Sequence, residues 1–284
     1  MTKNNPLVSC IIPTKNRPEF VMRAIQSVLG QSYTNIEIIV IDDSTYEETQ
    51  KVLDPLGGQI RYIRNQESRG APYSRNIGID AARGDAIAFL DDDDLWLPEK
   101  TMTQLRWLEK YPLVTCNYIT ELKGRRYFVR YPDIISYEDL LTVNALGSCS
   151  FVMVDGQAVK GCYFDENLKA GQDWDFWLSI MKEKSIASAA NAREYLVNYD
   201  NGDFARISNT NDMLTTFHTL YNKRRSEYSL NSARGLFFNA LRGDESFLLW
   251  VLLEWAKIKV KGKGGLLFLA KLVFNKLFRR IEIY

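Results

Sequence analysis

Short apolar segments alternate with helical patterns through the first 115 residues, and this alternation constrains the fold more than any other feature. Segments 7–13, 36–41, 60–64 and 85–90 are typical of short strands. Between them, one helical pattern begins at Pro18 and ends at Gly30, and another begins at Gly70 and ends near Gly84. Alternating strands and helices indicate βαβ units, so the sequence predicts an α/β fold with a mostly parallel, Rossmann-like sheet flanked by helices.

The pattern changes twice along the rest of the chain. From about 113 to 205 short strands and helices are mixed, with a hairpin turn around Gly124 and a helix near Asp173, and beyond 205 the pattern is helical. A chain of 284 residues has room for one domain of about 200 to 250 residues and an appendage. We therefore expect an α/β domain at 1–205, with halves at 1–112 and 113–205, and an all-helical C-terminal extension at 206–284.

Composition argues against several classes of protein. The net charge of +1 gives no general attraction to nucleic acid, so we expect no nucleic-acid partner. The four cysteines lack CxxC spacing, which indicates buried, reduced thiols and a cytoplasmic location. The N-terminus lacks the pattern of a signal peptide. The longest apolar run, 247–253, is far shorter than the roughly 20 residues that a membrane-spanning helix needs.

Acidic residues follow two of the predicted strands. Asp42 and Asp43 come after the strand at 36–41, and residues 91–94, all Asp, come after the strand at 85–90. Ligands of an open α/β sheet bind beyond the carboxyl ends of its strands, so both acidic turns should border one crevice. The carboxylates of Asp42 and Asp43 could accept hydrogen bonds there from a base or a ribose.

The four consecutive carboxylates at 91–94 repel one another unless solvent or a cation compensates their charge. Hard oxygen ligands suit Mg²⁺ or Mn²⁺, and Mg²⁺ takes one or two carboxylates together with water and substrate phosphates. A metal-diphosphate site follows from this pattern. The alternatives are a solvated acidic turn and a charge cluster at a helix N-terminus.

Three segments resemble the inverting glycosyltransferases of family 2, of the type that assembles bacterial surface polysaccharide. They read VSCIIPTKNRPEFVMRAIQSVLGQSYTNIEIIVIDDS, GAPYSRNIGIDAARGDAIAFLDDDDLWLPEK and GQDWDFWLSI, and they occur in the family's order between about residues 7 and 200. The resemblance implies a GT-A fold with a nucleotide-binding half at 1–112 and an acceptor half at 113–205.

The resemblance also implies roles for individual residues. Asp93 and Asp91 match the DxD element and would bind Mg²⁺ or Mn²⁺. The donor nucleotide sugar would be bound by residues from several segments: Pro13, Thr14, Arg17, Asp42, Asp43, Arg75, Asp91, Asp92 and Arg206. Arg206 matches a segment that closes over the diphosphate in some relatives, and its alternative is the start of an ordinary surface helix.

Asp173 falls where the family places the general base that deprotonates the acceptor hydroxyl. A carboxylate suits this task because an alcohol is a poor nucleophile until its proton leaves. The alternative is a helix N-cap, a position that favours Asp. Gln172 departs from the Glu usual in the family, which affects contacts with the acceptor. Trp96, beside the acidic turn, is a candidate for stacking against a sugar.

The end of the chain has a distinct composition. Residues 257–280 hold eight Lys or Arg and no acidic residue, interleaved with apolar residues. Such a basic amphipathic helix can lie in a membrane interface, which predicts a peripheral position on the inner face of the cell membrane. The alternative is a helix packed on the catalytic domain or at a dimer contact.

These observations lead to one leading function and two alternatives. The leading function is inverting transfer of a sugar from a nucleotide-diphosphate sugar, with UDP favoured, to a hydroxyl of a glycan or lipid-linked acceptor in surface polysaccharide biosynthesis. A sugar-1-phosphate nucleotidyltransferase would need an early Gly-rich loop, and residues 13–18 contain no Gly. A non-catalytic membrane scaffold that binds a nucleotide sugar is the second alternative.

Overall fold

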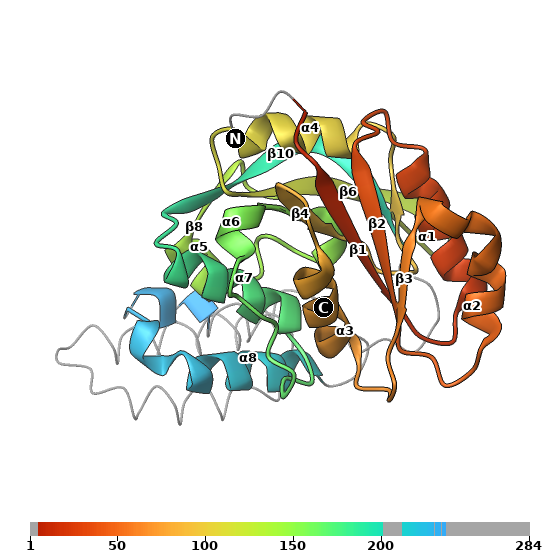
Figure 1. Cartoon of the computed structure of the whole chain (residues 1–284). Coiled ribbons are helices and arrows are strands. Elements are labelled where there is room, and N and C mark those ends of the chain that lie inside the picture. The colour runs from red at the N-terminus through yellow and green to blue at the C-terminus, as the bar shows by residue number, and fades with distance from the viewer. Residues whose placement is uncertain (1–4, 201–211, 230, 234, 237–284) are drawn as a thin grey trace, which may run out of the picture.

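The computed structural model describes residues 5–200, 212–229, 231–233, 235 and 236. Within these ranges a mixed β-sheet crosses the molecule, and helices pack against both of its faces (Figure 1). The α/β fold with helices on both faces of the sheet is therefore confirmed.

Four strands from the first half form the parallel part of the sheet. They are β1 (Val8–Thr14), β2 (Ile36–Asp42), β3 (Arg61–Arg64) and β4 (Ala86–Phe89). β1 lies between β2 and β4, and β3 pairs with the other edge of β2. Because these strands are parallel, their carboxyl ends lie along one edge of the sheet, where ligands of such folds bind.

Strands from the second half make the sheet mixed. From the half at 113–205 these are β6 (Leu113–Leu122), β7 (Arg125–Val129), β8 (Ile134–Ser136), β9 (Met153–Asp155) and β10 (Ser188–Tyr199), and they are joined by the short β5 (Leu95–Trp96) from the first half. β9 runs antiparallel between β4 and β6, whereas β10 is parallel to β6. The order is β3-β2-β1-β4-β9-β6-β10-β5, with β7 on β6 and β8 on β10. The hairpin expected around Gly124 is confirmed as the connection of β6 to β7.

Helices connect the strands. They are α1 (Pro18–Leu29), α2 (Glu48–Leu53), α3 (Ala71–Ala81), α4 (Lys100–Leu108), α5 (Tyr137–Thr142), α6 (Gly156–Val159), α7 (Gln172–Glu183) and α8 (Asp212–Lys223), with short 3₁₀ turns η1 (Asp54–Gln59), η2 (Cys149–Phe151) and η4 (Arg225–Glu227). Pro18 is the first residue of α1 and Gly30 is its C-cap, as the sequence predicts.

Alternate residues of β1 face opposite sides of the sheet, as the pleat requires. Ile11 belongs to a buried cluster with residues of α3 and α7. Cys10 and Ile12 belong to a second buried cluster with residues of α1 and α4. Both faces of the central strand are thus covered, which gives three layers.

A buried ion pair joins α8 to α7. Arg224 donates two hydrogen bonds to one carboxylate oxygen of Asp175, at 2.9 and 2.8 Å, and Lys223 pairs with the other oxygen at 2.9 Å. Phe217 and Leu220 of α8 also pack into the cluster around α7. The expected boundary at 205 and the basic amphipathic segment at 257–280 lie outside the described residues and stay predictions.

Two further expectations can be compared with the structure. All four cysteines are free and buried, as their spacing predicts. Of the helices that the structure describes, none is long and apolar enough to cross a membrane.

Candidate active site

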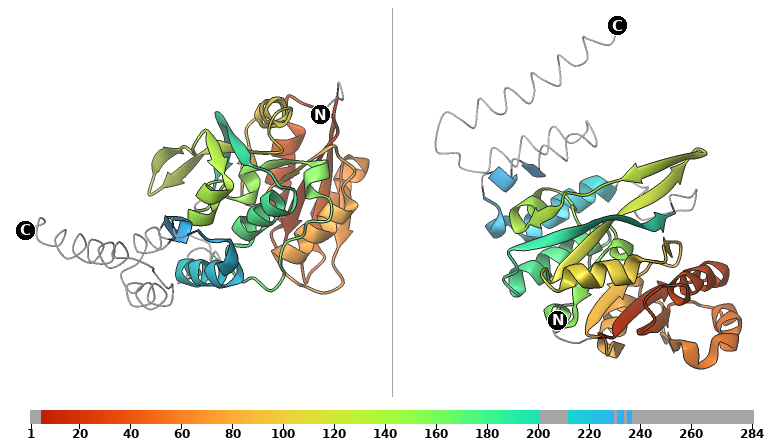
Figure 2. Two further views of the ribbon diagram at one scale, coloured as in Figure 1. Left: turned by 90° about the vertical axis from the view of Figure 1, so that its left-hand side faces the viewer. Right: turned by 90° about the horizontal axis from the view of Figure 1, so that it is seen from above.

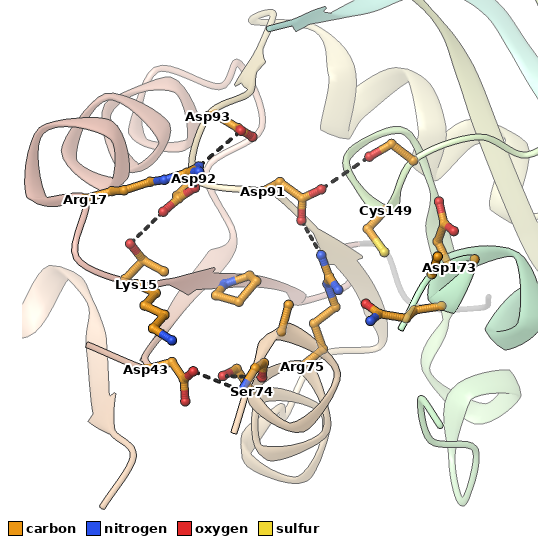
Figure 3. A pocket seen from close by; sticks show the side chains of 18 of the residues that line it. Lys15, Arg17, Asp43, Ser74, Arg75, Asp91, Asp92, Asp93, Cys149 and Asp173 are labelled. Carbon is orange, nitrogen blue, oxygen red and sulfur yellow. Dashed lines mark hydrogen bonds and ion pairs between the residues drawn. The ribbon is translucent and has the colours of Figure 1, made fainter. Parts of the chain in front are cut away.

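A cavity of about 580 Å³ opens beside the carboxyl ends of β1, β2 and β4 (Figure 3). Its walls come from the loop after β1, the residue after β2, the N-terminal turn of α3, the acidic turn after β4, the start of η2, the N-terminal turn of α7, the end of β10 and α8. Its lining includes Pro13, Thr14, Lys15, Arg17, Asp43, Ser74, Arg75, Asp91, Asp92, Asp93, Ser148, Cys149, Gly171, Gln172, Asp173, Tyr199 and Thr216.

The structure brings most of the residues singled out in the sequence to this one cavity. Both acidic turns border it, through Asp43 and through residues 91–93, and Asp173 lies on the opposite wall (Figure 3). Asp42 is the exception among the expected donor-binding residues that the structure describes. Its side chain is fully buried, accepts hydrogen bonds from the Tyr62 hydroxyl at 2.6 Å and the Ser44 N–H at 2.9 Å, and does not line the cavity. Arg206 lies outside the described residues.

Arg17 bridges two carboxylates of the acidic turn. Its Nη1 lies 3.2 Å from an oxygen of Asp92 and 3.2 Å from an oxygen of Asp93 (Figure 3). The Thr14 hydroxyl donates a second hydrogen bond to Asp92 at 2.7 Å. Burial raises the pKa of Asp92 to about 6, aided by the charges of Asp93 and Asp91 and opposed by the hydrogen bond from Thr14 and the charge of Arg17.

Arg75 places a second guanidinium on the other side of the turn. Its Nη2 lies 2.5 Å from Asp91, whose other oxygen accepts a hydrogen bond from the Ser148 hydroxyl at 3.3 Å. The Nε of Arg75 is buried and has no hydrogen-bond partner within the described structure. A buried unpaired donor is costly, so a ligand oxygen that accepts from Nε would be favoured.

A close helix-strand contact sets the position of Arg75. A Cβ on Gly78 of α3 would lie 2.3 Å from the Ile11 side chain of β1, so only glycine allows α3 to pack this closely. One turn earlier on the same helix, Arg75 reaches the carboxyl end of β4.

Asp43 is saturated with hydrogen bonds from the loop that precedes α3. Its oxygens accept from the side chains of Asn65 and Ser68 and from the backbone N–H groups of Arg69 and Gly70, all between 2.7 and 2.9 Å. Burial alone would raise the pKa of Asp43, but these hydrogen bonds outweigh it and lower the pKa. Asp43 therefore holds the loop and the start of α3 against the end of β2 as well as lining the cavity.

Asp173 lies in the first turn of α7. The N-cap is Gly171, in the left-handed conformation with φ 69°, so the alternative that Asp173 is the N-cap residue is wrong. One Asp173 oxygen still accepts a hydrogen bond from the N–H of Trp174 at 2.8 Å. A Cβ on Gly171 would lie 2.5 Å from Thr216 of α8, so glycine also allows α8 to approach the cavity wall.

Asn144 holds the second oxygen of Asp173. Its Nδ2 donates to Asp173 at 3.2 Å, and its Oδ1 accepts from the Gly147 N–H at 3.1 Å. Burial raises the pKa of Asp173 and the charge of Asp91 raises it further, against the opposing effects of Trp174, Arg75 and Asn144. A carboxylate with a raised pKa is a stronger base at neutral pH.

The residues of the acidic turn fit a divalent cation that shares its shell with phosphate. Asp91 and Asp93 offer two carboxylates at the cavity wall, the number that Mg²⁺ usually takes from a protein. Within the ranges that the structure describes, no cluster of three or more His, Cys, Asp or Glu could hold a metal unaided. The cavity has five carboxylates against three cations, Lys15, Arg17 and Arg75, so a bound diphosphate would need additional positive charge.

Several lining residues were not identified from the sequence. For Lys15, the only indication in the sequence is its position next to Thr14, an expected donor-binding residue. Ser148, Tyr199 and Thr216 carry no motif, and only the tertiary fold brings them to the cavity. The expectation that Trp96 stacks against a sugar is wrong, because its ring is buried, with the Lys100 ammonium 4.0 Å from the ring centroid.

Comparison with known proteins places this chain in a family. A sequence model of Glycosyl transferase family 2 matches residues 9–154. WcaA of Escherichia coli strain K12, a glycosyl transferase named for colanic acid biosynthesis, is 30% identical over 87% of this chain and 92% of its own length. The Escherichia coli UDP-Glc:alpha-D-GlcNAc-diphosphoundecaprenol beta-1,3-glucosyltransferase WfgD is 33% identical over 64% of this chain and 72% of its own length.

Solved structures show the same fold at lower identity. S. aureus TarS 1–349 in complex with UDP-GlcNAc matches 87% of this chain and 77% of its own, with a TM-score of 0.66 and 18% identity. The mannosyltransferase PcManGT from Pyrobaculum calidifontis, in complex with GDP-Man and Mn²⁺, matches 94% of this chain and 84% of its own, with a TM-score of 0.62 and 14% identity. By its matched family model, its relatives and its fold, the chain belongs to glycosyltransferase family 2.

Proposed function

We propose that this glycosyltransferase transfers a sugar, with inversion, from a UDP-sugar to a hydroxyl of a glycan or lipid-linked saccharide in surface polysaccharide biosynthesis. The observation that carries the proposal is the meeting of Asp173 with Asp91, Asp93 and Arg75 in one cavity. WfgD is named for a UDP-Glc donor and a diphosphoundecaprenol-linked acceptor, and TarS was solved with UDP-GlcNAc. Both names support a UDP-sugar donor, and the name of WfgD also supports a lipid-linked acceptor.

The donor would lie along the carboxyl ends of β1, β2 and β4, on the half at 1–112. Pro13, Thr14 and Asp43 would border the nucleotide, and Arg17 and Arg75 would face the diphosphate. Support comes from the unpaired Nε of Arg75 and from the position of Arg17 between two carboxylates. Asp42 would not contact the nucleotide itself. It would support the nucleotide site by holding the end of β2 to Tyr62 of β3 through its hydrogen bond.

A divalent cation, Mg²⁺ or Mn²⁺, would be held by Asp93 and Asp91 and would neutralise charge on the departing diphosphate. Asp92, bonded to Thr14 and Arg17, would hold the turn in place. PcManGT was solved with Mn²⁺, which supports this choice of ion.

Asp173 would accept the proton of the acceptor hydroxyl as this oxygen attacks the anomeric carbon. The proton passes to the carboxylate, a bond forms between the acceptor oxygen and the sugar, and the bond to the diphosphate breaks. The raised pKa of Asp173 supports this role, because a general base is most effective when its pKa approaches the working pH. Gln172, beside it, would contact the acceptor from the half at 113–205.

A lipid-linked acceptor also favours a peripheral position on the cytoplasmic face of the membrane. WfgD is named for a lipid-linked, diphosphoundecaprenol acceptor, which supports this position. The basic segment at 257–280 would contribute to the attachment.

A transfer assay tests the proposed function. Purified protein with Mn²⁺ is incubated with a panel of UDP-sugars and a diphosphoundecaprenol-linked GlcNAc acceptor, and products are analysed by mass spectrometry and NMR. We expect release of UDP and a product of inverted anomeric configuration. Release of pyrophosphate from a nucleoside triphosphate would support the nucleotidyltransferase instead, and donor binding without any turnover would support the non-catalytic scaffold.

A further inference from the structure

The β6–β7 hairpin extends beyond the body of the domain, as both views of Figure 2 show for the yellow-green strands. Its turn has positive φ at Lys123 (51°) and Gly124 (72°), the backbone of the tight two-residue turns that suit twisted hairpins. Every residue from 121 to 128 is exposed. The hairpin is therefore a narrow ribbon with solvent on both faces, and the ring of Phe128 also contacts the body of the domain, at Tyr195 of β10 with centroids 5.2 Å apart.

The end of this ribbon combines large apolar side chains with cations. Phe128 is 57% exposed, Leu122 49% and Tyr127 45%. Three exposed cations lie among them. We call these six residues the hairpin tip: Leu122, Lys123, Arg125, Arg126, Tyr127 and Phe128.

The apolar side chains of the hairpin tip lie on both faces of the ribbon. Tyr127 is paired with Thr120, and Phe128 is paired with Ile119, so the two rings lie on opposite faces. A flat protein surface could cover only one face at a time. A bilayer interface can surround the whole tip, and it favours aromatic side chains together with Lys and Arg.

The hairpin begins at the rim of the cavity. Thr120 of β6 is paired with Tyr199 of β10, and Tyr199 lines the cavity. The ring of Tyr118 also contacts that of Tyr199, with centroids 5.3 Å apart. From this point the strand continues for about three residues, roughly 10 Å, to the turn. A surface that bound the hairpin tip would therefore lie beside the cavity mouth.

We propose that the hairpin tip docks the enzyme onto an anionic phospholipid bilayer. The cations would lie among lipid phosphates while Leu122, Tyr127 and Phe128 enter the interfacial layer. The biological purpose, delivery of a lipid-linked acceptor to the cavity, rests on the proposed function, whereas the docking itself does not. Binding tests without any substrate therefore keep the two apart.

Site-specific fluorescence tests where the protein touches the membrane. The full-length chain with Lys123→Cys is labelled with an environment-sensitive fluorophore, and Lys51→Cys on α2 serves as a matched exposed control. When vesicles of phosphatidylglycerol and phosphatidylcholine are added, we expect the fluorescence emission of the label at 123 to shift to the blue. Spin-labelled lipid in the same vesicles should quench that fluorescence. The label at 51 should not respond.

Three outcomes would overturn the proposal. The first is an unchanged label at 123 while the protein sediments with vesicles, which would place the contact elsewhere. The second is a complete lack of binding to anionic vesicles. The third is a spectral shift at 123 that depends on protein concentration and needs no vesicles, which would identify a second copy of the chain as the partner.

A charge variant tests the contribution of the cations. Each cation near an anionic surface contributes to the free energy of membrane binding. Loss of three cations in the variant Lys123→Gln, Arg125→Gln, Arg126→Gln should therefore lower the vesicle partition coefficient about 100-fold. The matched variant Arg23→Gln, Lys51→Gln, Lys110→Gln removes three exposed cations elsewhere and should bind like the wild type. Equal losses in both variants would show that only the total charge matters. Transfer to a water-soluble acceptor should be unchanged in both.

Discussion

Replacing Asp173 with Asn removes the carboxylate that we propose as the general base while it keeps the shape of the side chain. The loss of general base catalysis should lower kcat by about 10²- to 10⁴-fold. Donor binding should change little, because the proposed donor contacts come from the loop after β1, α3 and the acidic turn. Asp54→Asn, an exposed change on η1 outside the cavity, is the matched control and should keep wild-type kcat.

The pH profile of transfer gives a second, independent test of the same reasoning. Because burial raises the pKa of Asp173, activity should fall on the acid side at a higher pH than for an ordinary Asp, whose pKa is 3.8. Asn144→Ala removes a hydrogen bond that lowers this pKa, so the acid limb should move to still higher pH. Single-turnover rates between pH 4 and 9 measure both effects. Full activity of Asp173→Asn, or an acid limb that Asn144→Ala leaves in place, would refute the role of Asp173.

Three further predictions concern stability. Burial lowers the pKa of Lys100 to about 8 from an ordinary 10.5, so carrying the charge in the folded state costs free energy below pH 8. In urea unfolding, the stability of the wild type relative to Lys100→Met should therefore rise by about 3 kcal/mol between pH 8 and 10.5. A difference in stability that does not change with pH would contradict this. Arg224→Ala should lower the unfolding free energy by about 3 kcal/mol, because Asp175 loses its buried partner but keeps Lys223. A loss below about 1 kcal/mol would be inconsistent with a stabilising ion pair. Asp43→Asn should lower the unfolding free energy by about 1–3 kcal/mol in the same assay, because the amide NH₂ would face the Ser68 hydroxyl or the Gly70 N–H, which are donors themselves. The same change should weaken UDP binding, measured by calorimetry. Unchanged stability would show that these hydrogen bonds contribute little.

The first half of the fold could be predicted because its elements are local. Buried parallel strands and the proline and glycine that bound α1 leave their pattern in consecutive residues. The insertion of β9, antiparallel between β4 and β6, has no such pattern, because pairing between strands far apart in the chain depends on the assembled core. The sheet is therefore more mixed than the sequence indicates.

Neighbouring residues in the site could not be told apart from the sequence. Asp42 and Asp43 are adjacent and chemically identical, but Asp42 ends β2 and bonds to Tyr62, while Asp43 lines the cavity. Trp96 is close to the acidic turn in sequence, yet the pairing of β5 with β10 buries it. Asn144 holds Asp173 from a position 29 residues earlier, which no local pattern could reveal.

If the donor diphosphate and the acceptor base share one cavity, a crystal structure with a UDP-sugar and Mn²⁺ should show both of them there. We predict the diphosphate between Arg75 and the acidic turn, the metal on Asp91 and Asp93, and the anomeric carbon facing the side chain of Asp173. A nucleotide bound outside this cavity, or a sugar whose anomeric carbon points away from Asp173, would rule out the shared site.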